Sequence, residues 1–375
     1  MSLTFLHTGD VHLGAPFKHL GSRAPEQRKQ LRTTFKQVVD LAIERDVDLF
    51  LCAGDLFDSN TVSDTDVAFA RTELERLEKA HIPLVLIGGT HDCLADVAVL
   101  KREGVLNDLQ NVTLLTPEQP QLVFEDLGVT VSGTSNTTNK SRTSPLQDFP
   151  TEANTPLHIG MIHGSLAIPG KHAENDMPFT TEEIEATGLD YLGVGHWHSL
   201  NDISSEHVTA YYAGSPEAID FGEHRAGYVI IGTLEEGAKP EIEPVRVGMR
   251  TFDRKEIDVT GYTTTIDIIK KIQCDADGQC AMEVILSGVK RPDLTLDVSV
   301  LEEELSEHVF QILVKDKTTV SLDDIDEASI PEQLVYGQFV RRMKQQLQEA
   351  ETEEQRKVVE TALQIGIAHL AGKDD

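Results

Sequence analysis

The chain has 375 residues, with 63 acidic against 33 basic side chains and a formal net charge of −30. A charge of that sign repels polyanions at long range, which argues against a surface evenly coated for nucleic-acid binding. Apolar residues make up 39 % of the sequence, and no stretch approaches the roughly 18 consecutive apolar residues of a membrane helix. We therefore expect no membrane association.

Residues 3–250 alternate short apolar runs with amphipathic stretches, which predicts an α/β domain whose sheet is covered by helices. One helix is expected to begin near Pro25 and a second to follow Ser63. Residues 112–133 and 207–234 are instead typical of strands joined by turns, which predicts a second sheet or an antiparallel extension. Five apolar runs are short enough for strands: Leu3–Thr8, Leu49–Ala53, Pro83–Ile87, Leu157–Ile162 and Asp190–Val194.

One early segment departs from the overall acidity. Between Lys18 and Lys36 the sequence places six basic residues against one acid, Glu26. A solvated helix face is the simpler interpretation of this segment, and a local basic binding face is the alternative. The region after residue 300 is rich in Asp and Glu, so charge is unevenly distributed along the chain.

The length of the chain predicts a second folding unit, because one hydrophobic core rarely organises more than about 250 to 300 residues. Near residue 251 the pattern changes to a compact α+β group with the segments TTTIDIIKKI, AMEVILSG and FQILV. We assign residues 1–250 to the large domain, 251–325 to a small α+β domain and 326–375 to C-terminal helices. The apolar faces of these helices either fold back onto the chain or dock a partner.

The cysteines and the start of the chain favour a cytoplasmic protein. The first residues, MSLTFLHTGD, lack the basic stretch and the small-residue cleavage site of an export signal. The four cysteines form no Cys-x-x-Cys pair and are too sparse for a disulfide scaffold. They are Cys52, Cys93, Cys274 and Cys280. Reduced thiols in the cytoplasm are the expectation.

Each of the five apolar runs is followed within a few residues by side chains that can bind metal. Side chains at the carboxyl ends of neighbouring strands converge in one crevice of an α/β sheet, and adjacent glycines permit the tight turns. The candidate groups are Asp10, His12, Asp55, His91, Asp92, His163, His196 and His198. The remaining histidines have no comparable setting.

A mixed set of carboxylates and imidazoles suits Mn, Fe or Zn rather than Ca. The donors are too many for one ion. Two ions about 3.5 to 4 Å apart, sharing a carboxylate and an activated water, are the usual arrangement for hydrolysing phosphate esters. Asp55 lacks a neighbouring histidine, unlike Asp10, and is the candidate bridge. A single Asp-x-His pair would be a weak signal, but the ordered series favours a metal site.

The ordered motifs Asp-x-His, Gly-Asp-x-x-Asp, Gly-x-His-Asp, His and Gly-His-x-His resemble the calcineurin-like metallophosphoesterase superfamily. Within it, GDLFD at 54–58, GHWH at 195–198 and the YAGSPE and FGE segments at 212–223 resemble the DNA double-strand-break repair exonucleases of the SbcD type, the nuclease subunit of SbcCD. The resemblance covers about residues 3–250. It implies a two-sheet sandwich flanked by helices, with a capping domain and C-terminal helices beyond it.

The resemblance also implies a function. It predicts a metal-dependent nuclease that hydrolyses DNA phosphodiesters in double-strand-break repair, with two divalent metal ions. Mn is the first expectation, with Mg, Fe or Zn as alternatives. The implied partners are DNA and an SMC-like ATPase of the SbcC type bound by the C-terminal helices, and a homodimer is left open.

Site residues follow from the same motifs. Asp10, His12, Asp55 and His198 are expected at the first ion, and Asp55, Thr90, His163 and His196 at the second. His91 would face the scissile phosphate, stabilising its charge or protonating the leaving oxygen, and Asp58 would pair with His91. Asp92 is expected to support the site, and Trp197 either packs between ligands or stacks on a base.

Thr90 departs from the superfamily pattern, which has Asn before the His. A threonine hydroxyl is a shorter and poorer oxygen donor than an amide, which predicts a weaker second metal site. Two other functions stay open: an esterase of small nucleotides or phosphoproteins, and a metal-poor scaffold of the same fold. The extra domain after residue 250 favours DNA, because a small-substrate esterase needs only the catalytic domain.

Overall fold

A computed structural model describes residues 2–168, 174–273, 277–291, 294–320 and 335–370. The chain divides into two compact units, Met1–Asp253 and Arg254–Asp375, each of which is described by itself. The boundary lies close to the expected one at residue 250. A further division near residue 325 stays a prediction.

The first sheet of unit 1 carries the N-terminal strand at its centre. Its strand order is β14-β13-β1-β2-β3-β4, in which β1 to β4 are parallel and β13 is antiparallel to β1. The strands are β1 (Ser2–Thr8), β2 (Leu49–Cys52), β3 (Leu84–Leu86), β4 (Val112–Leu114), β13 (Tyr228–Glu235) and β14 (Glu241–Arg246). Cys52 pairs with both Thr8 and Leu86, so the carboxyl ends of β1, β2 and β3 align.

The second sheet also has four parallel strands, but here they lie in its middle. Its order is β11-β12-β10-β7-β6-β5, with β5 and β11 as antiparallel edges. The strands are β5 (Gln121–Phe124), β6 (Val129–Gly133), β7 (Leu157–His163), β10 (Tyr191–Gly195), β11 (Asn201–Asp202) and β12 (Thr209–Tyr212). The strand-like region 112–133 is therefore split: β4 joins the first sheet, whereas β5 and β6 join the second.

The two sheets pack face to face and form a sandwich. Leu49 and Leu51 of β2 lie in one core cluster with Ile159 and Tyr191 of the second sheet. Phe50, between them, points to the opposite face and packs under the helices. This alternation is the two-residue period of a strand buried on both sides. The expected α/β two-sheet sandwich flanked by helices is confirmed.

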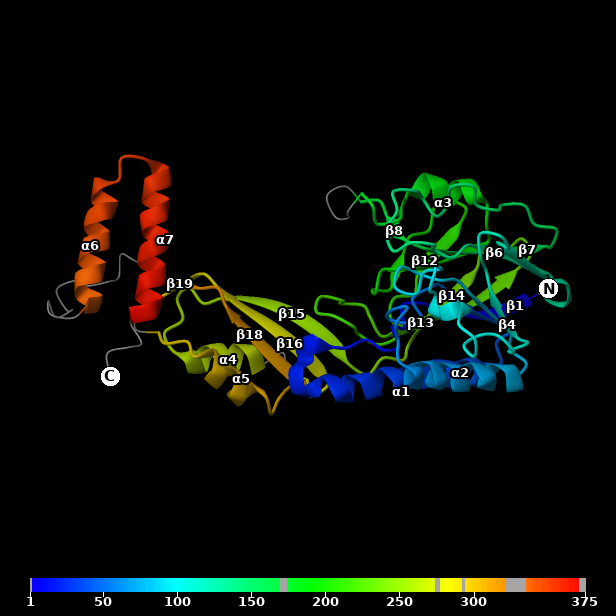
Figure 1. The fold of residues 1–375 in the computed structure, drawn as a ribbon, viewed down its shortest axis with the longest axis horizontal. Coiled ribbons are helices and arrows are strands. Elements are labelled where there is room, and N and C mark those ends of the chain that lie inside the picture. Colours follow the sequence, from blue (N-terminus) through cyan, green and yellow to red (C-terminus); the bar gives the residue numbers. More distant parts are fainter. Residues whose placement is uncertain (1, 169–173, 274–276, 292–293, 321–334, 371–375) are drawn as a thin grey trace. The chain divides into compact units, whose positions relative to one another are not determined.

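Helices α1 (Ala24–Glu44) and α2 (Asp64–Lys79) cover the outer face of the first sheet (Figure 1). Pro25 lies in the first turn of α1, where its missing N–H costs no hydrogen bond. Ser63 caps α2 by accepting a hydrogen bond from the Asp66 N–H. On the second sheet, α3 (Thr181–Thr187) packs through Ile184.

Three of the six basic residues in the segment near α1 form ion pairs. The pairs are Arg23–Glu26, Arg32–Asp66 and Lys36–Asp40. Such surface pairs contribute little stability, but they reduce the positive charge of this face. The ion-paired residues fit the solvated helix face, and a local basic binding face stays the alternative.

Unit 2 is a small α+β group followed by two helices. Its three-stranded sheet has the order β15-β16-β18, and α4 and α5 pack on it through Ile268 and Leu301. The short strands β17 and β19 form a separate two-stranded sheet, and α6 packs against α7 with Val340 and Leu363 buried. The elements are β15 (Thr251–Asp258), α4 (Thr265–Gln273), β16 (Cys280–Ser287), β17 (Val289–Lys290), α5 (Val298–Leu305), β18 (Gln311–Asp316), β19 (Thr319–Val320), α6 (Val335–Glu349) and α7 (Glu353–Leu370).

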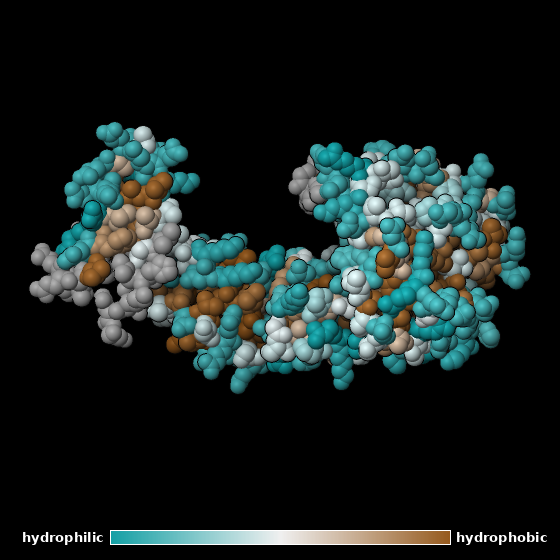
Figure 2. Space-filling view, viewed as in Figure 1, coloured by the Kyte–Doolittle hydropathy of each residue, from teal (hydrophilic) through white to brown (hydrophobic). Residues whose placement is uncertain are grey.

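The surface is predominantly hydrophilic. On the face shown in Figure 2, hydrophilic residues cover most of unit 1, with smaller apolar areas between them. Among the described residues, no helix is both long enough and apolar enough to span a bilayer.

Candidate metal centre

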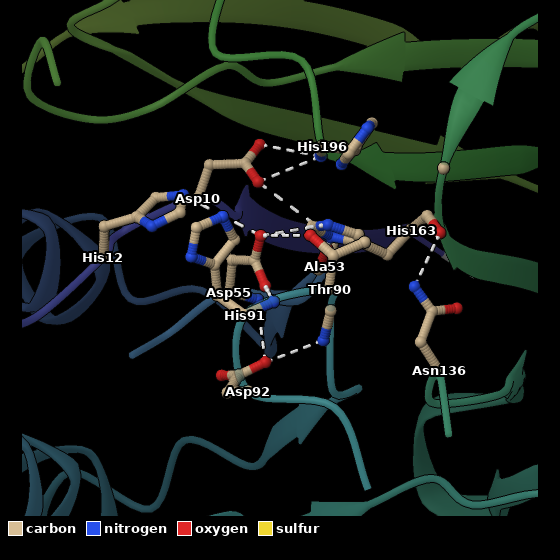
Figure 3. Close-up of polar contacts among 12 residues, drawn as sticks. Asp10, His12, Ala53, Asp55, Thr90, His91, Asp92, Asn136, His163 and His196 are labelled. Carbon is tan, nitrogen blue, oxygen red and sulfur yellow. Dashed lines mark hydrogen bonds and ion pairs between the residues drawn. The ribbon is translucent and has the colours of Figure 1, made fainter. Parts of the chain in front are cut away.

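The loops that follow β1, β2, β3, β7 and β10 bring the predicted metal-binding side chains together between the two sheets. Asp10 N–H donates to the Gly54 carbonyl at 3.0 Å and His12 N–H to the Asp55 carbonyl at 2.9 Å, so the first two loops run side by side. Gly195 pairs with His163, which aligns the ends of β7 and β10. Figure 3 shows the side chains from these loops directed toward a common centre.

Four of these residues hold a backbone conformation that L-residues rarely adopt. The φ angles are 51° at Asp10, 51° at His12, 52° at Asp55 and 107° at His196. Such conformations cost of order 1 to 3 kcal/mol each and persist only where the surroundings enforce them. Because these strained residues cluster in one set of loops, we infer that the surrounding fold enforces the orientation of their side chains.

Close backbone approach at the site requires glycine. A Cβ atom on Gly195 would lie 2.0 Å from the Ala53 carbonyl oxygen and 2.8 Å from Nδ1 of His163. A Cβ on Gly89 would lie 2.3 Å from a carboxylate oxygen of Asp55. These glycines explain the Gly-His and Gly-x-His patterns of the sequence, because a larger residue would displace a neighbouring candidate ligand.

Two three-residue groups meet at Asp55. The donor atoms of Asp10, His12 and His198 lie within 4.8 Å of one another, as do those of Asp55, His163 and His196. Oδ2 of Asp55 is 3.1 Å from Nε2 of His163 and 3.8 Å from Nε2 of His12, so it faces both groups. This is the position that a bridging carboxylate would need.

Three imidazoles direct one ring nitrogen toward the centre, and this convergence fits bound cations. Nε2 of His163 is buried and makes no hydrogen bond of regular geometry among the described residues, although Oδ2 of Asp55 lies 3.1 Å away. Nε2 of His12 and Nε2 of His198 face each other at 3.1 Å. A buried unsatisfied nitrogen is costly unless it has a partner, and a divalent cation would provide one.

The other nitrogen of each of these rings is held by an oxygen. Such outer contacts fix the tautomer of a metal-binding histidine and orient its ring. They join Nδ1 of His163 to the Ala53 carbonyl at 2.9 Å, Nδ1 of His12 to Oδ1 of Asp58 at 3.2 Å, and Nδ1 of His198 to Oε1 of Glu223 at 2.6 Å.

Burial and charge shift the ionisation of these groups strongly. Burial alone would lower the pKa of His198, but the Glu223 carboxylate outweighs it and raises the pKa to about 9. Burial opposes protonation of His163 in the same way, and Asp55 raises its pKa to about 9. Burial alone would raise the pKa of Asp55, but His163 holds it well below its usual range. The raised pKa values favour protonated imidazoles at neutral pH, and a bound cation would displace these protons.

Asp92 supports the loop that carries Asp55. Its buried carboxylate accepts hydrogen bonds from the backbone N–H groups of Gly89 at 2.7 Å, Asp55 at 3.2 Å and Phe57 at 3.2 Å. Burial and the nearby Asp55 carboxylate raise the pKa of Asp92 to about 7. Asp92 thus holds the backbone of the loops that carry Asp55 and Gly89, and it belongs to neither donor group.

The partner of His91 differs from the expected one. Nδ1 of His91 lies 2.9 Å from the backbone carbonyl of Asp58, whereas the Asp58 carboxylate contacts His12. The expected pairing of the Asp58 carboxylate with His91 is therefore not the contact that the structure shows, and it stays a prediction. The reason is local: Asp58 N–H donates to the Leu13 carbonyl, which turns its side chain toward the loop of His12. His91 itself is exposed at the edge of the site, and its donor atom lies within 4.8 Å of those of His12 and Asp58, which form a third group with it.

Thr90 lies beside the second group. Its hydroxyl donates to Oδ2 of Asp55 at 3.3 Å, so it contacts the oxygen that faces both groups. Trp197 packs inside the protein: its ring stacks on Tyr212 with centroids 4.9 Å apart, and its Nε1 donates to Oγ of Ser165 at 3.1 Å. The packed aromatic is the alternative that the structure supports.

Two acidic residues at the site were absent from the sequence-based prediction. Glu223 belongs to the FGE segment of the resemblance, which was a usable signal. Asp176, whose Oδ1 lies 3.1 Å from Nε2 of His196, stands in a segment without any recognisable motif.

Comparison with known proteins identifies a family model that matches the part of the chain that carries these residues. The model of the calcineurin-like phosphoesterase family matches residues 3–200. That span contains every candidate ligand named above. The family model therefore matches more than half of the chain.

Several curated proteins resemble the chain over most of its length. An uncharacterized metallophosphoesterase, YhaO of Bacillus subtilis, is 26 % identical over 344 residues, covering 84 % of this chain and 82 % of YhaO. The DNA double-strand break repair protein Mre11 of Sulfolobus acidocaldarius is 26 % identical, covering 72 % of this chain and 71 % of Mre11. Mre11 of Sulfurisphaera tokodaii is also 26 % identical, with 90 % and 88 % covered.

Proposed function

Because the chain belongs to the calcineurin-like phosphoesterase family and is a metallophosphoesterase, we propose that its substrate is DNA. It would act as a metal-dependent nuclease of the SbcD type, hydrolysing phosphodiesters in cytoplasmic double-strand-break repair. The observation that carries the proposal is the meeting of two donor groups at Oδ2 of Asp55. The similarity to two Mre11 repair proteins across both units supports DNA over a small substrate.

Two divalent cations would occupy the two donor groups. Asp10, His12, Asp55 and His198 would hold one, and Asp55, Thr90, His163 and His196 the other. Mn suits this mixed set of carboxylates and imidazoles, with Mg, Fe or Zn as alternatives. When bound, such ions make a water molecule nucleophilic at neutral pH and offset negative charge on a phosphoryl group.

His91 is the group placed to exchange a proton with the substrate. The Asp58 carbonyl can only accept, so Nδ1 of His91 carries the proton in this contact and Nε2 stays available. The ring is exposed beside the donor groups, where a phosphodiester would enter. From there Nε2, when protonated, can stabilise phosphate charge or protonate the leaving oxygen. Asp58 holds His12 with its carboxylate and His91 with its carbonyl, which makes it a positioning residue for both.

The partner would be an SMC-like ATPase that docks on α6 and α7. These helices bury Val340 and Leu363 against each other and leave Val335 and Val358 exposed by 70 % and 65 %. Exposed valines on a helical pair suit a helical partner. A partner that supplied basic surface would also compensate for the net charge of −30, which by itself repels DNA. A homodimer is compatible with this assembly.

The test is degradation of linear DNA by the full-length protein with Mn. Wild type should degrade the DNA, and chelation by EDTA should abolish the activity. Turnover of bis-p-nitrophenyl phosphate without DNA degradation would move the protein to the small-substrate class. Protein that binds no metal would instead be a scaffold of the same fold.

A further inference from the structure

The four candidate imidazole ligands share one structural rule. In His12, His163 and His198 one ring nitrogen contacts a protein oxygen, and the other faces the cluster. His196 completes the rule through Asp176, whose Oδ1 lies 3.1 Å from Nε2 of His196. Asp176 reaches the site from a different chain segment, just before β9 (Pro178–Phe179).

The partly exposed Asp176 is itself held by hydrogen bonds that lead into the core. Its Oδ2 accepts a hydrogen bond from Oγ of Ser165 at 2.6 Å, and that oxygen accepts one from Nε1 of Trp197 at 3.1 Å. Ser165, in β8 (Ser165–Leu166), is fully buried. Trp197 stacks on the buried Tyr212, whose hydroxyl donates to the Gly164 carbonyl at 2.8 Å. The orientation of the Asp176 carboxylate is thus set by hydrogen bonds from the core.

The geometry separates Asp176 from the donors themselves. Asp55, His163 and His196 form a group with mutual distances within 4.8 Å, and Asp176 is not a member of it. In Figure 3 one ring nitrogen of His196 lies on the side of Asp10 and His163, and the other points away from them. Nε2, which contacts Asp176, is therefore assigned to the outward side, and Nδ1 to the cluster.

We propose that Asp176 is the positioning residue of His196: it accepts a hydrogen bond from the Nε2 N–H and so keeps Nδ1 unprotonated for the second cation. This rests on the proposed metal-dependent function. Asp176 also adds a negative charge beside the group in which Thr90 supplies only a hydroxyl. Outer partners of this kind typically change metal affinity 10- to 100-fold. The Trp197–Ser165–Asp176 network would thus compensate for the weak donor at position 90.

The test compares Mn binding by titration calorimetry of metal-free wild type, Asp176→Ala and Asp176→Asn. Asp176→Ala should weaken the second Mn site by about 10- to 100-fold and leave the first unchanged. Asp176→Asn keeps an oxygen that can accept a hydrogen bond from the Nε2 N–H, so it should lose less Mn affinity at the second site. This variant serves as the test if Asp176→Ala does not fold. The matched control is Glu185→Gln, which alters an exposed carboxylate–histidine pair with His207 and should change neither site.

A second readout does not depend on bound metal. In metal-free protein with ¹⁵N-labelled histidine, near pH 9, His196 should carry its proton on Nε2 in wild type and in Asp176→Asn, and should shift toward a mixture of tautomers in Asp176→Ala. Unchanged Mn affinities in Asp176→Ala, or an unchanged His196 tautomer, would overturn the role of Asp176. Wild type that binds fewer than two Mn ions would contradict the proposed function instead, and the tautomer would still decide on Asp176.

Discussion

At the scale of single residues, the oxygen on the outer side of each ring decides which nitrogen is left for a cation. Ala53, Asp58 and Glu223 provide this oxygen for three of the histidines. The sequence predicted the inner residues, because each follows an apolar run that ends at the same edge. It did not predict the direction of the Asp58 carboxylate or the presence of Asp176, since both depend on contacts between loops distant in sequence.

Thr90 predicts unequal affinities for the two ions. Its hydroxyl is engaged by Asp55 and reaches less far than an amide oxygen. Mn titration of wild type should therefore show one tight and one weaker site, and Thr90→Asn should tighten the weaker site by roughly 10-fold. Two equally tight sites in wild type would show that the threonine carries no penalty.

His91 predicts a separation of metal binding from catalysis. His91→Ala should retain both Mn sites, because the residue lies at the exposed edge and outside the two groups joined at Asp55. Cleavage of linear DNA should fall by about 10²- to 10⁴-fold, the usual contribution of a positioned acid or base. Loss of Mn from the variant would instead make His91 a ligand.

At the scale of elements, the site depends on how closely the strand-end loops approach one another. The parallel register of β1, β2 and β3 brings their carboxyl ends level, and the glycines allow the loops to touch. Sequence periodicity predicted these strands but could not assign β4 and β5 to different sheets. Each is short, and the two are separated by only a few residues, so the apolar pattern carries no information on which sheet each one joins.

Gly195→Ala tests this packing. The added Cβ would clash with the Ala53 carbonyl and the ring of His163, and so would displace the oxygen that fixes the His163 tautomer. We expect a loss of about 1 to 3 kcal/mol in the free energy of unfolding and weaker Mn binding, measured by urea denaturation and calorimetry. Gly278→Ala is the control, since nothing lies within 4 Å of its added Cβ. Equal effects of both substitutions would remove the packing argument.

At the scale of the whole molecule, the protonation of two buried histidines at the site governs how stability responds to pH and metal. The pKa values of His163 and His198 are raised from 6.5 to about 9. A raised pKa in the folded state gives stability that is complete below pH 6.5 and lost as the pH rises through 9. Cations compete with these protons, so their binding strengthens over the same range.

Melting temperature should report both effects. Between pH 6.5 and 9, Tm in EDTA should fall, while the increase in Tm produced by Mn should grow. Glu223→Gln removes the carboxylate that raises the pKa of His198, and it should flatten the fall. A Tm in EDTA that stays constant or rises over this range would contradict the protonated state of these imidazoles.

The central claim is that two cations share Asp55 between the two donor groups. Anomalous diffraction from crystals of the full chain grown with Mn tests it most directly. We predict two peaks about 3.5 to 4 Å apart, one beside Asp10, His12 and His198 and the other beside His163 and His196, with the Asp55 carboxylate between them. A single peak away from Asp55, or no peak among these side chains, would contradict the account.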